Sequence, residues 1–208
     1  RLGFPVFPLE WTTAEGEIYS GYRENGYFPE SFINMLAFLG WNPGTTQEIF
    51  SLEELCESFT LERVAKAGAK FDADKTKWFQ QNYLRATSDE KLAEMLASQL
   101  NVTLPSDKLI MMARLMKERS TFISDMVSEG GYLLTSPESY DEQTLNKKWK
   151  ENTTELMTEW KDKLTTISSF VASEIESTFK TFLEEKELGI GAVLPNFRLL
   201  ITGNGTGP

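Results

Sequence analysis

Apolar residues recur along most of this 208-residue chain at intervals of three or four positions, the spacing of amphipathic helices. Within GYFPESFINMLAFLGWNPGT, residues 26–45, this spacing places Phe32, Leu36 and Leu39 on one helix face. Pro29 suits the first helical turn, where its missing N–H costs nothing, and Gly40 suits a left-handed end. The pattern predicts a helix from Pro29 to about Gly40 that buries this apolar face.

Further helices are indicated by polar residues that suit helix N-termini. Ser51 and Glu54 have the spacing of a capping box. We expect this box to open a helix that turns Leu52, Leu55 and Phe59 inward. Cys56, the sole cysteine, is expected as a small buried residue beside them.

Three more helix starts follow along the chain. Asp72 is the expected cap of a helix whose entry is packed by Phe71 and which carries Trp78, Phe79 and Tyr83. Thr87 and Glu90 suggest a second capping box, and Ser106 a further cap. The expected core positions after these caps are Leu92, Leu96, Leu100, Leu109, Met111, Met112, Ala113 and Met116.

A break is expected at Gly130-Gly131 and Ser136-Pro137, and a more polar region follows. A helix is expected from about residue 168 to 187, with Phe170 among its core residues and with Gly189 and Gly191 at its end. The predicted fold class is all-α, with two helical-bundle subdomains. We place a short irregular or strand-like segment at 1–25, one subdomain at 26–118 and the other at 119–208. The boundary between the two subdomains is expected between about residues 100 and 140.

Composition excludes several kinds of chemistry. The chain has no histidine, so it cannot supply a Ser-His-Asp or Cys-His catalytic system or the usual histidine–cysteine zinc site. It contains no glycine-rich phosphate-binding motif. No apolar run approaches the roughly 18 residues that span a bilayer, and a single cysteine suits a reducing compartment. We expect no catalytic residue, no metal site and no membrane contact in this chain, and a cytoplasmic location.

The formal net charge is −10, which disfavours a nucleic-acid partner at first sight. Positive charge is nevertheless concentrated locally, and phosphate contacts depend on local lysines and arginines. Between residues 63 and 85, six basic residues face only two aspartates: Arg63, Lys66, Lys70, Lys75, Lys77 and Arg85. A second basic stretch holds Lys108, Arg114, Lys117 and Arg119 with only Glu118. Both stretches are candidate contacts to a nucleic-acid backbone, although ordinary solvated helix faces have the same composition.

Four segments in order resemble bacterial glutamyl-tRNA synthetases. The run GYFPESFINMLAFLGW resembles the segment that follows the family's catalytic domain. Lys70-Phe71-Asp72 followed by Lys77-Trp78 and Tyr83, then Gly131-Tyr132-Leu133-Leu134, and finally Phe197 to Gly203 resemble later family signatures. The N-terminal segment, residues 1–22, is longer than the corresponding segment of most relatives, and we assign it no role.

The resemblance implies the tRNA-binding part of an enzyme whose catalytic domain lies outside this chain. The first helical subdomain, 26–118, would contact the tRNA stem. The second, 119–208, cut short at its C-terminus, would hold the anticodon loop. ATP, Mg²⁺ and glutamate chemistry would belong to the missing catalytic domain, so no cofactor is expected in this segment. The implied partners are tRNA-Glu and the protein's own catalytic domain, and the full-length enzyme would be a monomer.

The resemblance also implies anticodon-binding residues. Arg119 lies thirteen residues before Tyr132, where the family places an arginine against the first anticodon base in enzymes that charge only tRNA-Glu. Arg198 matches the arginine of the family's P-L-R run and would contact the other anticodon bases. Thr206 and Pro208 resemble a turn that lines a base pocket.

Two alternatives stay open from the residues alone. An acidic helical module that binds protein and no RNA would also explain the net charge and polar helix faces. A free-standing enzyme is disfavoured by the absence of histidine and of a nucleotide-binding loop.

Overall fold

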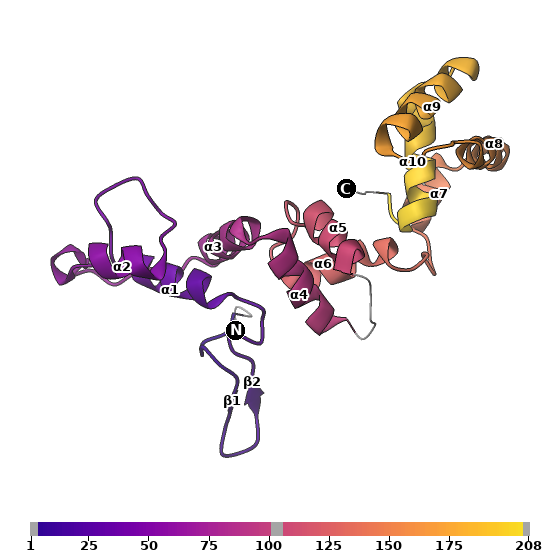
Figure 1. The fold of residues 1–208 in the computed structure, drawn as a ribbon. Helices are drawn as coiled ribbons and strands as arrows, with labels where there is room; N and C mark the ends of the chain where they lie inside the picture. The colour runs from indigo at the N-terminus through magenta and orange to yellow at the C-terminus, as the bar shows by residue number, and fades with distance from the viewer. Residues whose placement is uncertain (1–3, 101–105, 206–208) are drawn as a thin grey trace. The chain divides into compact units, whose positions relative to one another are not determined.

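The computed structural model describes residues 4–100 and 106–205, and it divides into two compact units between Gly130 and Gly131. Helices dominate both units (Figure 1), so the predicted all-α fold class is confirmed. The first unit contains β1 (Trp11–Thr12), β2 (Ile18–Tyr19), α1 (Pro29–Phe38), α2 (Leu52–Ser58), the short 3₁₀ helix η1 (Leu61–Arg63), α3 (Ala73–Ala86), α4 (Asp89–Gln99), α5 (Ser106–Met116) and α6 (Ile123–Gly130). The second contains the 3₁₀ helix η2 (Gly131–Leu133), α7 (Glu142–Lys148), α8 (Thr153–Thr165), α9 (Ala172–Glu185) and α10 (Ile190–Thr202).

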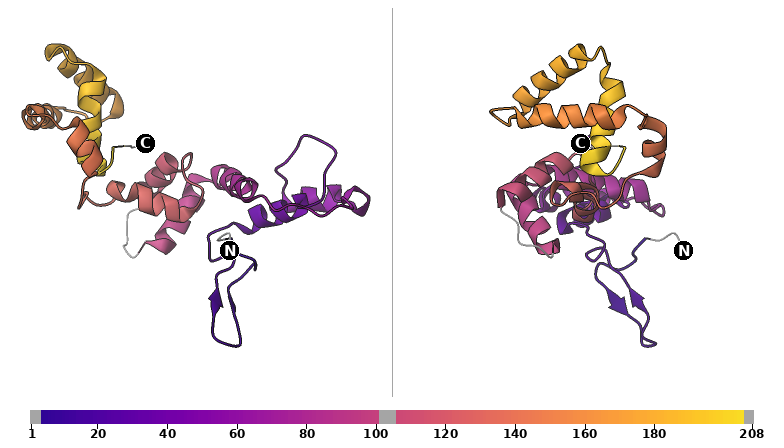
Figure 2. Two further views of the ribbon diagram at one scale, coloured as in Figure 1. Left: turned by 180° about the vertical axis from the view of Figure 1, so that it is seen from behind. Right: turned by 90° about the vertical axis from the view of Figure 1, so that its right-hand side faces the viewer.

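The strand-like N-terminal segment forms a small antiparallel hairpin. Trp11 pairs with Tyr19 and Thr12 with Ile18, and the two strands run side by side in both views of Figure 2. The ring of Trp11 contacts those of Phe7 and Tyr19, at centroid distances of 5.0 and 6.3 Å. The hairpin therefore carries an aromatic surface, with Trp11 itself half exposed.

Helix α1 begins at Pro29 and is followed by Gly40 at φ 115°, as the sequence predicts. The face that it buries differs from the prediction. Ser31, Asn34 and Met35 are buried, whereas Leu36 and Leu39 are 46% and 40% exposed.

Hydrogen bonds explain this reversal. The Asn34 side-chain oxygen accepts the Phe50 backbone N–H at 2.9 Å, and the Gln80 side-chain oxygen accepts that of Phe28 at 2.8 Å. These buried amides tie α1 to the segment before α2 and to α3, because a buried backbone N–H requires an acceptor. The expected apolar face of α1 instead lines an open groove of about 580 Å³, together with Phe4 and Phe71.

Two of the four predicted helix caps, Ser51 and Asp72, are confirmed. Ser51 and Glu54 make both hydrogen bonds of a capping box, and Asp72 accepts from the backbone N–H groups of Asp74 and Lys75. At α4 the cap is Ser88, whose hydroxyl accepts from the Lys91 N–H. The predicted Thr87–Glu90 box is therefore wrong by one residue.

Around α2 and in α5, four residues expected in the core are exposed. In α2 only Leu55 is buried, while Leu52 and Phe59 are 51% and 42% exposed. Cys56 is exposed as well. In α5 the predicted core of Leu109, Met112, Ala113 and Met116 is confirmed, whereas Met111 is 61% exposed. A helix buries only part of its apolar surface, and helical periodicity alone does not show how wide the buried face is.

Helix α6 belongs to the first compact unit. It packs against α4 and α5, although it lies beyond residue 118, where the first subdomain is expected to end. The division of the structure at Gly130 falls within the expected range of 100–140.

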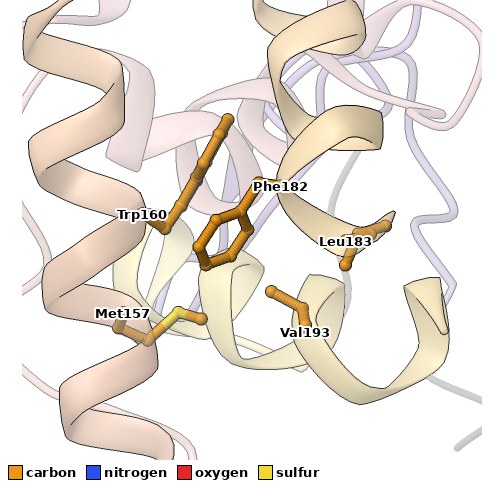
Figure 3. Close-up of a cluster of buried hydrophobic side chains, with 5 residues drawn as sticks. All are labelled: Met157, Trp160, Phe182, Leu183 and Val193. Atoms are coloured by element: carbon orange, nitrogen blue, oxygen red, sulfur yellow. The ribbon is translucent and has the colours of Figure 1, made fainter. Parts of the chain in front are cut away.

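The core of the second unit lies among α8, α9 and α10. Met157 and Trp160 from α8, Phe182 and Leu183 from α9 and Val193 from α10 point toward one another (Figure 3). Phe179 and Phe197 add edge contacts to the Trp160 ring at 4.9 and 5.7 Å. This aromatic cluster orients α10.

Helix α9 begins and ends differently from the prediction. It starts at Ala172, so Phe170 precedes it and is 71% exposed. At its end Glu187 adopts the left-handed conformation at φ 52°, and the Leu188 N–H donates to the Leu183 carbonyl at 2.9 Å. This six-residue bond is the Schellman closure usually built on glycine. The predicted end of α9 at Gly189 and Gly191 is wrong, because Gly189 is the N-cap of α10 and Gly191 lies inside this helix, which begins at Ile190.

Candidate nucleic-acid interface

The basic residues between 63 and 85 divide into exposed and engaged groups. Lys66, Lys70 and Lys77 are exposed, and no hydrogen bond or ion pair of their side chains occurs within the part of the chain that the structure describes. These three ammonium groups are the ones available to an external phosphate.

The other three basic residues make contacts within the protein. Arg63 donates to the carbonyl of Pro43. Lys75 pairs with Glu48 and lies 4.1 Å from the centre of the Trp78 ring, a cation–π contact. Arg85, at the end of α3, contacts Glu118. A charge count along the sequence cannot separate the two groups, because Glu48 and Glu118 lie far from their partners in sequence.

Arg119 lies in the turn that follows α5. Its backbone N–H donates to the Met116 carbonyl at 3.1 Å. Its side chain is exposed, and among the described residues it has no hydrogen-bond or ion-pair partner. The turn thus presents a free guanidinium, a planar group that can both stack on a base and donate several hydrogen bonds.

The basic residues next to Arg119 are paired with one carboxylate. Lys117 Nζ lies 2.8 Å from Asp89 Oδ1, and Arg114 Nε lies 3.1 Å from Asp89 Oδ2. Hydrogen bonds from Lys117 and then Arg114 hold the pKa of the Asp89 carboxyl below its usual value. Asp89 was not a candidate from the sequence, because nothing in its local pattern indicates two cationic partners about 25 residues away.

Arg198 lies in the second unit, on α10, and is half-buried. Its neighbour Phe197 packs into the aromatic core, at 5.7 Å from Trp160. Successive residues on a helix point about 100° apart, so burial of Phe197 turns Arg198 toward the rim of this core. No ion pair of Arg198 occurs among the described residues.

The glycine of the C-terminal motif has a specific structural role. Gly203 ends α10 with φ 74°, and a Cβ there would come within 2.7 Å of the Ser139 carbonyl oxygen. Its own carbonyl accepts the Asp141 N–H at 2.8 Å. Gly203 therefore fixes where the chain leaves α10.

Thr206 and Pro208, the other predicted anticodon-binding residues, lie outside the described residues. Residues that precede Thr206 in sequence line a polar pocket of about 360 Å³. It joins the segment after η2 to the end of α10, and it is lined by Tyr132, Thr135, Ser136, Pro137, Glu138, Ser139, Tyr140, Asp141, Thr202, Gly203 and Asn204. The residues that line this pocket form no motif in the sequence that would indicate it.

Within residues 4–100 and 106–205, no three histidine, cysteine or acidic residues are grouped so that they could hold a metal ion. No helix in these ranges is long and apolar enough to cross a membrane.

Comparisons with known proteins bear on the whole chain. Residues 73–208 match the family model described as the anticodon binding domain, and residues 16–78 match that of the class I tRNA synthetase catalytic domain for Glu and Gln enzymes. Glutamate–tRNA ligases from Christiangramia forsetii and Flavobacterium psychrophilum are 46% and 47% identical over 212 residues, which cover 100% of this chain. The chain belongs to the anticodon binding domain family, and glutamate–tRNA ligases match it over its whole length.

Solved structures of the family agree. A glutamate–tRNA ligase from Elizabethkingia meningosepticum, described as a complex with its amino acid, has a TM-score of 0.94 and 40% identity over 100% of this chain. The enzyme from Elizabethkingia anophelis has a TM-score of 0.87 and 37% identity over the same coverage. The chain spans 42% of the length of the two ligases compared in sequence and 42% and 41% of the two solved chains.

These matches correct one expectation and support another. The catalytic domain does not lie wholly outside this chain, because its family model matches residues 16–78. Most of the segment is nevertheless the anticodon binding domain, as predicted. The alternative of an acidic protein-interaction module has no support in these comparisons.

Proposed function

We propose that this chain is the tRNA-binding and anticodon-recognition region of a full-length enzyme that ligates glutamate to tRNA-Glu using ATP. The observation that carries the proposal is the match of residues 73–208 to the anticodon binding domain. The 42% share of the relatives' length leaves most of the parent enzyme outside this segment. ATP, Mg²⁺ and glutamate would be bound by that remainder, which is also this segment's partner within one polypeptide. The parent enzyme would be a cytoplasmic monomer.

Base recognition is assigned to Arg119 and Arg198. Anticodon bases are unpaired, so they can be splayed out and recognised by stacking and by hydrogen bonds to their edges. Arg119 is exposed in a turn and Arg198 lies at the rim of an aromatic core, and neither has an ion pair among the described residues. Thr206 and Pro208 would complete the base site.

Backbone binding is assigned first to Lys66, Lys70 and Lys77. These side chains are exposed and have no ion pair within the described ranges. Arg63, Lys75 and Arg85 make contacts inside the protein, so we assign them a smaller share of phosphate binding. A negatively charged body with local basic groups favours docking in one orientation over indiscriminate polyanion binding.

Equilibrium binding of the full-length enzyme to a tRNA-Glu transcript tests the proposal. The comparison is a transcript whose three anticodon bases are all replaced. We expect weaker binding of the altered transcript by at least about tenfold, since each lost base contact is worth roughly 1–3 kcal/mol. Arg198→Ala should reduce the difference in affinity between the two transcripts. Glu53→Gln, a change on the acidic surface, is the control and should leave this difference unchanged. Equal affinity for both transcripts would contradict anticodon recognition by this enzyme.

A further inference from the structure

Two ion pairs tie the end of α5, and the turn after it that carries Arg119, to the start of α4. Asp89, the first residue of α4, binds Lys117 at 2.8 Å and Arg114 at 3.1 Å. The side chains of Lys117 and Asp89 are only 17% and 20% exposed, so this pair is largely shielded from solvent. The N-terminus of α4 further stabilises the negative charge of Asp89.

A second tie holds the residue directly before Arg119. Arg85 Nη2 donates to the backbone carbonyl of Glu118 at 2.5 Å, and Arg85 Nε lies 3.3 Å from Glu118 Oε2. The contact to the carbonyl matters more for geometry, because it fixes the backbone of the turn as well as a side chain. Arg85 thus connects the end of α3 to residue 118.

The two ties leave one guanidinium in the turn without a partner. Lys117 and Glu118 are both neutralised by residues of other helices, whereas the Arg119 side chain has no ion pair among the described residues. In particular, the adjacent carboxylate of Glu118 is occupied by Arg85 and does not compete for Arg119. The arrangement restrains the turn and keeps the charge of Arg119 available.

We infer that Arg85 and Asp89 are positioning residues that fix the Lys117–Arg119 turn and thereby direct Arg119 toward an anticodon base. This inference rests on the function proposed above. The Arg114–Asp89 and Arg85–Glu118 pairs each include a side chain that is at least 70% exposed, and such pairs contribute little to folding stability. Their effect here is to preorganise a recognition group, since small misplacements of such a group are costly to the reaction.

The sequence suggests a competing role for Arg85, a direct contact to the tRNA backbone. The two roles predict different kinetics. A phosphate contact weakens binding to every transcript alike and lowers the salt dependence of binding. A positioning residue changes the preference between transcripts, and only while Arg119 is present.

A double-mutant cycle in the full-length ligase separates these roles. The quantity measured is the selectivity ratio, defined as kcat/KM for the tRNA-Glu transcript divided by kcat/KM for a transcript with one altered anticodon base. The variants are Arg85→Gln and Asp89→Asn, each alone and combined with Arg119→Ala. Lys91→Ala is the matched control, because it breaks only an exposed pair with Glu94 on the same helix α4. Melting temperatures show that each variant is folded.

We expect Arg85→Gln and Asp89→Asn each to lower the selectivity ratio by about tenfold, or ~1.4 kcal/mol. Neither should change it further in the Arg119→Ala background, and Lys91→Ala should leave it at the wild-type value. An unchanged ratio in both single variants, with Arg119→Ala still lowering it, overturns the positioning role alone. If Arg119→Ala itself leaves the selectivity ratio unchanged at all three anticodon bases, base recognition by Arg119 is wrong. The positioning role of Arg85 and Asp89 is then wrong as well.

Discussion

Tyr83 links three segments of the first unit through one hydroxyl group. The hydroxyl lies 2.8 Å from the Asn34 side-chain oxygen and 2.5 Å from the Phe50 carbonyl. Asn34 itself is fully buried and accepts the Phe50 N–H. Removal of the hydroxyl leaves buried acceptors with fewer donors, and such loss costs more than a hydrogen bond contributes on average.

We therefore predict that Tyr83→Phe lowers the free energy of unfolding by about 1–2 kcal/mol in urea denaturation. Tyr140→Phe is the control, because that residue is 44% exposed. Its effect should stay within about 0.5 kcal/mol. Equal effects of the two substitutions would show that the Tyr83 hydroxyl does not join these segments.

The same residue gives a prediction for pH. Burial raises the pKa of Tyr83 to about 12. Below pH 10 the phenol is protonated in both folded and unfolded chains, so its contribution to stability is constant. Above pH 10 the unfolded chain loses the proton first, so stability falls as pH rises toward 12. Between pH 10 and 12 the free energy of unfolding of the wild type should fall more than that of Tyr83→Phe. The same pH dependence of this free energy in both proteins would contradict the raised pKa.

At the scale of elements, helix starts are encoded locally and are therefore readable from the sequence. Asp72 caps α3 by accepting from two backbone N–H groups. We predict that Asp72→Ala lowers the free energy of unfolding by about 1 kcal/mol, the usual cost of losing a cap. Asp74→Ala, which removes an acidic residue from the same first turn without removing the cap, should cost less. Thermal unfolding of both variants provides the comparison, and equal losses would argue against capping by Asp72.

The buried faces of the helices are less readable, because they depend on distant partners. Sequence periodicity correctly predicts the limits of α1 but selects Leu36 and Leu39 as its core face. The structure buries Asn34 instead, since this amide bonds to Phe50 and Tyr83. A polar residue whose side-chain oxygen accepts hydrogen bonds from residues 16 and 49 positions away has no local signature.

The candidate interface shows the same limit. Arg119, through its spacing to Tyr132, and Arg198, through its motif, are candidates from the sequence, and both are at least partly accessible. Asp89, which pairs with the cations beside Arg119, was not found, because its role appears only when α4 and α5 are folded together.

At the scale of the whole molecule, the proposed binding of tRNA by a chain of net charge −10 requires local groups of cations. We predict that Lys70→Ala and Lys77→Ala each weaken tRNA binding by the full-length ligase without altering anticodon preference. Each should lower the slope of log K against log salt by about one, if each lysine contacts one phosphate. Lys75→Ala is the matched control, because Lys75 is already paired with Glu48. A slope that stays at the wild-type value in all three variants would contradict phosphate binding by this surface.

The central claim is that this segment recognises the anticodon through Arg119, and one measurement tests it most directly. It is kcat/KM of the full-length ligase, wild type and Arg119→Ala, for tRNA-Glu transcripts altered singly at each of the three anticodon bases. We predict that Arg119→Ala lowers the selectivity at one of these bases by about tenfold or more, with the wild-type ratio retained at the others. Wild-type ratios at all three bases in the Arg119→Ala enzyme would contradict it.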